Sequence, residues 1–182
     1  MTVPVGRNAK FIFAPVLLVV GGLVAWLGVR EPLAARRLQI RDYPKLFAEN
    51  GSCRPGGDPI KNAHRLEEHA RLRAERYAYD PREGVRAVWR YQEADACYRV
   101  ARDEVGARRA HRAGAALAHR VNTDFAAARL HLSNALQREQ WSVALGEIRR
   151  LRLLTDHVGE HEYVEWLEEI IGRVTVEANA AS

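Results

Sequence analysis

An apolar segment near the N-terminus places the strongest constraint on this chain of 182 residues. Residues 11–29 read FIFAPVLLVVGGLVAWLGV, which is 19 positions without a charged side chain. As an α-helix this segment would be about 28 Å long, close to the thickness of the hydrocarbon core of a bilayer. A cleaved signal peptide has a shorter apolar region that ends in small residues, whereas Arg30 and Glu31 follow directly here. The sequence therefore predicts a short tail, residues 1–10, and a transmembrane helix, residues 11–29.

The sequence signals for the orientation of this segment in the membrane disagree. Arg7 and Lys10 precede it, and a larger group of basic side chains follows between residues 30 and 45. The positive-inside rule would place the larger group in the cytoplasm. A short basic tail before a signal-anchor, and an even number of cysteines, favour the opposite orientation. We expect a single-pass protein of the inner (cytoplasmic) membrane with a cytoplasmic N-terminus and a periplasmic helical domain, and the charge count keeps the reverse orientation open.

The two cysteines are candidates for a disulfide bond. Cys53 lies in NGSCRPGGDP, the most loop-like stretch of a juxtamembrane segment that we assign to residues 30–58. Cys97 lies on a predicted helix, off the inferred core stripe, so both thiols are expected to be accessible. In an oxidising compartment such thiols usually pair. In a cytoplasmic domain they would stay free, and the sequence leaves both outcomes open.

The rest of the chain has the periodicity of amphipathic helices. Asp58-Pro59 and Asp80-Pro81 each combine an N-cap residue with proline at the first helical position. Apolar residues then recur at spacings of three and four, which predicts helices over residues 59–79, 81–101, 106–138, 141–157 and 163–174. Cap residues at 122–124 allow an alternative break in the third helix. The predicted fold is all-α: a transmembrane helix, then an antiparallel bundle or short α-solenoid over residues 59–177 and a disordered tail, residues 178–182.

Two stretches of this helical region resemble tetratricopeptide repeats. In the stretch 128–145, the matching positions are Leu132, Ser133, Leu136, Trp141 and Ala144. In the earlier stretch, the positions that match a second helix are Tyr91, Ala94, Tyr98 and Ala101. Tyr91 and Trp141 occupy equivalent positions but are 50 residues apart, whereas the repeat spacing of the family is about 34. The later stretch also lacks the turn glycine, so the resemblance is to the packing pattern of the family.

This resemblance implies a protein-interaction module with a groove lined by first-helix residues. Asn134 stands where the family often has an asparagine that binds the backbone of a peptide. Arg129, His131 and Arg138 would lie near it. These four residues form the candidate partner groove.

No readable motif supports catalysis or cofactor binding. The chain has no HExxH, CxxC, GxSxG or phosphate-binding glycine loop. His157 and His161 are four residues apart, but Gly159 lies between them, so we do not expect a metal site. We therefore expect a protein that is not an enzyme, with no catalytic residues, no metal and no cofactor.

The middle of the chain is its most basic region. The arginines that form this candidate anion-binding face are Arg99, Arg102, Arg108, Arg109, Arg112 and Arg120. Without interleaved aromatic residues they do not indicate nucleic acid binding, but they could contact an anionic polymer or lipid headgroups. Our leading interpretation is a membrane-anchored scaffold or assembly factor of an envelope complex that binds a protein partner, with the anion binder as the alternative and the oligomeric state open.

Overall fold

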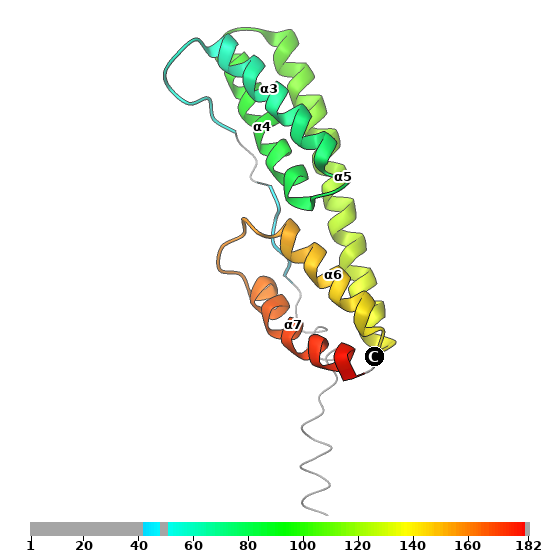
Figure 1. Ribbon diagram of the computed structural model, residues 1–182. Helices are drawn as coiled ribbons and strands as arrows, with labels where there is room; N and C mark the ends of the chain where they lie inside the picture. Colours follow the sequence, from blue (N-terminus) through cyan, green and yellow to red (C-terminus); the bar gives the residue numbers. More distant parts are fainter. Residues whose placement is uncertain (1–41, 48–50, 181–182) are drawn as a thin grey trace, which may run out of the picture. The chain divides into compact units, whose positions relative to one another are not determined.

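The computed structural model describes residues 42–47 and 51–180. Within these ranges the chain forms five α-helices and no strand, which confirms the all-α fold class for this part of the chain. The helices are α3 (Pro59–Arg76), α4 (Pro81–Val100), α5 (Glu104–Gln137), α6 (Trp141–Leu154) and α7 (Glu162–Ala180) (Figure 1). The predicted transmembrane helix, residues 11–29, and the tail before it lie outside the described residues. No helix in the described ranges has both the length and the apolar character needed to cross a bilayer.

Local sequence signals explain where the first helices start. Asp58 caps α3 by accepting a hydrogen bond from the backbone N–H of Ile60 at 3.0 Å. Asp80 caps α4 in the same way, accepting from the backbone N–H of Arg82 at 3.0 Å. Proline follows each aspartate, where its missing N–H costs no hydrogen bond. The predicted starts of these helices are therefore confirmed.

The ends of α4 and α5 use the left-handed backbone conformation without glycine. Arg102 has φ 59° and Glu139 has φ 56°, each just after its helix. After α4, the N–H of Asp103 donates to the carbonyl of Tyr98 at 2.9 Å, which satisfies an otherwise free helix carbonyl. The turn at Glu139 is the one that lacks the family's glycine in the repeat-like stretch. A non-glycine side chain in this conformation stores strain.

Consecutive helices pack against one another along the chain. Contacts join α3 to α4, α4 to α5, α5 to α6 and α6 to α7. The long helix α5 has 34 residues and is continuous through residues 122–124, so the alternative break is not present. Figure 1 shows α3 and α4 beside the first part of α5, and α6 beside its second part. Helix α5 therefore packs against α4 along its first part and against α6 along its second part.

The predicted apolar stripes form the core. Leu132, Ile148, Leu151 and Leu167 are buried. Helices α4 and α5 approach closely at Gly114, because a Cβ atom at this position would lie 2.9 Å from the Cβ of Tyr91.

Helix ends differ from the predictions by a few residues, as expected where caps and tertiary contacts decide the last turn. The structure ends α3 at Arg76 and α6 at Leu154, and it continues α7 to Ala180, inside the stretch predicted as a tail.

A disulfide bond joins Cys53 to Cys97 across 44 positions of sequence, with the two Cα atoms 4.7 Å apart. Cys97 is only 1% exposed, so the expectation that it lies off the core was wrong. Because α4 packs against both α3 and α5, its buried face is wider than the single stripe that the spacing suggested. The bond connects the loop before α3 to the buried side of α4.

Candidate protein-interaction site

The residues of the predicted partner groove lie in two different environments. Arg129 is half-buried, whereas His131, Asn134 and Arg138 are exposed. Nδ1 of His131 lies 3.5 Å from a carboxylate oxygen of Glu147 on α6. Arg129 instead contacts aromatic rings of α5 and of residues before α3. Arg129 and His131 are two positions apart on one helix and point in different directions, so Arg129 lies apart from the other three. His131, Asn134 and Arg138 follow one another at spacings of three and four and share a face.

Arg129 belongs to a cluster of aromatic side chains that the sequence pattern did not reveal. Its guanidinium carbon lies 3.8 Å from the ring centroid of Tyr43 and 4.9 Å from that of Phe125. The ring of Tyr163 packs edge-on against Tyr43 at 5.1 Å and against Phe125 at 6.1 Å. Trp166 stacks on Tyr163 at 5.7 Å. We call the side of this cluster formed by Phe125, Arg129, Tyr163 and Trp166 the aromatic site.

The segment that meets the aromatic site, residues 42–47, has no helix or strand. Pro44 and Leu46 are buried, and Leu46 is only 3% exposed, whereas Lys45 between them is exposed. Nε2 of His157, in the loop after α6, donates a hydrogen bond of 2.9 Å to the carbonyl of Leu46. A segment without helix or strand is thus held by ring contacts at one end and by a backbone hydrogen bond at the other.

His157 is itself positioned by α4. Its ring packs edge-on against Trp89, with centroids 4.8 Å apart. Burial lowers the pKa of His157, and the hydrogen bond to Leu46 and the nearby charge of Asp156 oppose that shift. The ring is therefore neutral near pH 7, with its proton on the nitrogen that faces the carbonyl.

The aromatic site keeps unused hydrogen-bonding capacity. Nε of Arg129 and Nε1 of Trp166 are buried donors without a hydrogen-bond partner among the described residues. An open hollow of about 400 Å³ lies beside Arg129, and its lining also includes Tyr43, Leu46 and Asn122. Buried donors without acceptors cost free energy, which a carbonyl oxygen placed there would recover.

The arginines of the predicted anion-binding face differ in which residues they contact. Arg99 pairs with Asp95 at 2.9 Å, and Arg109 makes two hydrogen bonds of 2.7 Å to Glu67. Arg102 lies in the turn before α5 and Arg120 lies over the ring of Tyr77, 5.5 Å from its centroid.

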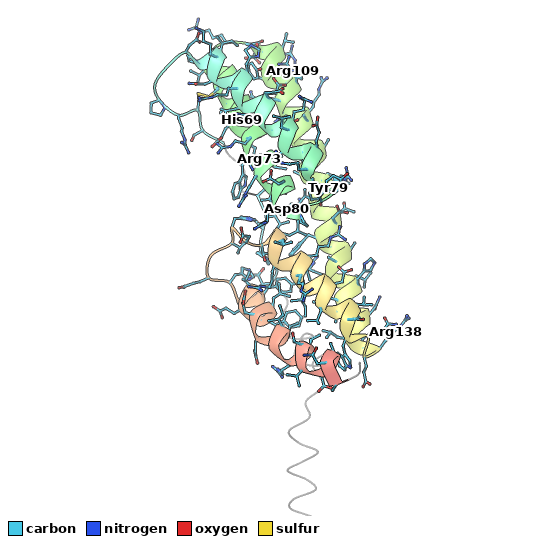
Figure 2. The ribbon with its side chains drawn as sticks, in the orientation of Figure 1. His69, Arg73, Tyr79, Asp80, Arg109 and Arg138 are labelled. Carbon is cyan, nitrogen blue, oxygen red and sulfur yellow. A yellow bond between two sulfur atoms is a disulfide. The ribbon has the colours of Figure 1, made fainter. Side chains whose placement is uncertain are left out.

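Only two arginines of that set are exposed on α5 with no charged or aromatic partner among the described residues. These are Arg108 and Arg112, one helical turn apart. Figure 2 shows Arg109 near the start of α5 and Arg138 just after its end, so the arginine-rich face and the predicted groove lie at opposite ends of this helix.

Polar clusters between the first helices are structural. Tyr98, fully buried, donates to Glu67 at 2.6 Å and accepts from Arg109 at 3.1 Å. Burial and the bond to Glu67 raise the pKa of Tyr98 to about 12, and the hydrogen bond from Arg109 lowers the pKa of Glu67. All partners are satisfied, which suits a support for the packing of α3, α4 and α5 and leaves no free acid or base.

Among residues 42–47 and 51–180, no three His, Cys, Asp or Glu side chains are placed to hold a metal ion. No protein-family model, no curated protein and no solved structure matches this chain.

Residues 42–47 fall within the juxtamembrane segment predicted for residues 30–58, whose first part has the composition of a helix, and the sequence predicted none of their contacts. A signal was present in RDYPKLFAEN, where apolar residues interrupt a charged stretch. Four such residues are too few to show a period, so only the tertiary structure reveals what they contact.

Proposed function

We propose that this chain is a membrane-anchored protein-interaction module, a scaffold or assembly factor of an envelope complex, built on tetratricopeptide-like helices. One observation carries the proposal: the helical domain holds residues 42–47, a segment without helix or strand, against a cluster of aromatic side chains. Aromatic rings and arginine are the side chains most enriched where proteins bind one another. The anchor in this proposal is the apolar segment 11–29.

Photo-cross-linking in cells tests the proposal directly. A photoreactive residue is placed, one at a time, at Asn122, Asn134 or Arg138 on the second half of α5. We expect a protein adduct at one or more of these positions and none at Arg108, the matched exposed position near the start of the helix. Absence of any protein adduct at all three positions would contradict the interaction module.

The membrane anchor has its own test. Full-length protein should stay with the membrane fraction during carbonate extraction, because a spanning helix is not removed by high pH. Recovery in the supernatant of a form that starts after about residue 30 would show cleavage and refute the anchor.

A second function, binding of anionic polymer or lipid headgroups, rests on Arg108 and Arg112. Both are exposed and lack a charged partner among the described residues, so their charges are available. Vesicles with phosphatidylglycerol should then retain more protein than neutral vesicles, with retention falling steeply between low and moderate salt. The variant R108Q/R112Q should lose this salt-dependent retention, whereas R99Q, whose arginine is already paired, should keep it.

A further inference from the structure

We propose that the aromatic site is a receptor for an extended peptide of the pattern Tyr-Pro-x-Leu, and that residues 42–47 occupy it in competition with such a segment of a partner protein. The proposal rests on the proposed interaction function and adds the site and the chemistry of the partner. It treats Tyr43-Pro44-Lys45-Leu46 as a resident ligand of the helical domain.

The way this segment binds has the features of peptide recognition. Tyr43 supplies a ring that packs between Arg129 and Tyr163, and Leu46 supplies a buried aliphatic side chain. Pro44 fixes its own φ and favours an extended residue before it, so little conformational entropy is lost on docking. Grooves lined by aromatic side chains bind proline-containing extended segments for the same reason.

The resident segment fills the site incompletely. Its backbone accepts a hydrogen bond from His157 at the carbonyl of Leu46. The donors on Arg129 and Trp166 have no acceptor among the described residues, and the hollow of about 400 Å³ is lined in part by Arg129. A longer partner segment could place carbonyl oxygens at these donors, which gives it an advantage over the resident one.

Attachment to the same chain gives the resident segment a high effective concentration. For a segment tethered within the same chain this concentration is on the order of millimolar. A partner peptide must therefore bind more tightly than the resident segment, or arrive at a high local concentration, to displace it. Weakening the resident segment should expose the site without altering the receptor side.

Fluorescence anisotropy with the full-length protein in detergent tests this competition. The probe is a labelled synthetic peptide of sequence RDYPKLFAEN. We expect the double variant Y43A/L46A to bind the probe with half-saturation at least about tenfold lower in concentration than the wild-type protein, because the tethered competitor is gone. A probe with its tyrosine and leucine replaced by alanine should not bind.

Two further variants show whether binding uses the aromatic site. Adding R129A to Y43A/L46A should abolish probe binding, whereas adding Y79A should not, since Tyr79 is an exposed tyrosine, 89% accessible, on the turn after α3. Circular dichroism verifies that each variant keeps its helices. Should Y43A/L46A not fold, a probe with a photoreactive group at the tyrosine position is cross-linked to wild-type protein, and adducts must map to α5 or α7.

Three results would overturn the proposal. These are a folded Y43A/L46A variant that ignores the probe, binding that survives R129A, and cross-links that map outside α5 and α7. Residues 42–47 would then be a fixed part of the core. Such a failure is distinguishable from failure of the interaction module, because protein adducts at Asn134 or Arg138 would still support the latter.

Discussion

Replacing Glu83 with glutamine removes the charge that three arginines share at the hairpin between α3 and α4. Glu83 lies in the first turn of α4, and its side chain is 10% exposed. Arg73 contacts one carboxylate oxygen at 2.6 Å, and Arg76 contacts the other at 2.9 and 2.6 Å. Arg86 lies farther away, at 3.5 Å. The carboxylate is therefore the centre of a charge network that joins two helices.

The expected loss of stability depends on how exposed the arginine partners of Glu83 are. Breaking a buried ion pair costs about 3–5 kcal/mol because the remaining charge has no partner and no water. Here Arg73 and Arg76 are 30% and 58% exposed, so both can regain hydration. Glutamine also keeps one acceptor for a neutral hydrogen bond. We therefore expect E83Q to lower the free energy of unfolding by about 1–2 kcal/mol at pH 7.

The pH dependence of the stability difference between wild type and E83Q distinguishes loss of the charge from a change in packing. Burial raises the pKa of Glu83, but the hydrogen bond from Arg76 and the charges of Arg73 and Arg76 outweigh it and hold the pKa below its ordinary value of 4.5. A lowered pKa in the folded state adds stability above the unfolded value, and that stability is lost as the pH falls through the folded value. The difference between wild type and E83Q should thus be full at pH 7 and shrink below about pH 4.5.

Urea unfolding followed by circular dichroism, on full-length protein in detergent, measures this difference at pH 7 and pH 3.5. The matched control is E75Q, since Glu75 pairs with Arg71 on the exposed face of α3 with both side chains more than half exposed. E75Q should leave the midpoint unchanged at both pH values. An E83Q difference of the same size at both pH values would refute the electrostatic reasoning.

Three other predictions concern single positions, each read from thermal or urea unfolding. G84A should destabilise the fold by about 1–3 kcal/mol because its Cβ would lie 2.2 Å from the ring of Tyr77, whereas G146A, with nothing within 4 Å, should stabilise α6 by about 0.5–1 kcal/mol. E139G should raise stability by about 1 kcal/mol by relieving the left-handed backbone at φ 56°, and an unchanged midpoint would show that no strain is stored there. C53S should lower the free energy of unfolding by about 2–4 kcal/mol, because it opens a loop of 44 residues. A reducing agent should lower the stability of the wild-type protein but not that of C53S.

Much of the helical framework is determined locally. The aspartate-proline pairs at Asp58 and Asp80 set the starts of α3 and α4, because capping needs only the residue and its own first turn. The spacing of Leu132 and Leu136 along α5 identified a core face, since side chains three or four apart share a face of any helix. These properties depend on the backbone of one helix and are visible in the sequence.

The candidate site depends on contacts that no local period describes. Tyr43 meets Arg129 and Tyr163 across 86 and 120 positions, and Arg109 pairs with Glu67 across 42. The position of Cys97 was predicted wrongly for the same reason, because a second helix packs on the side of α4 that one stripe left free. Helical periodicity fixes which residues of one helix share a face, but the angle and depth at which two helices pack depend on all the side chains between them. Only the tertiary structure could therefore bring a segment without helix or strand, an arginine and three aromatic rings to one site.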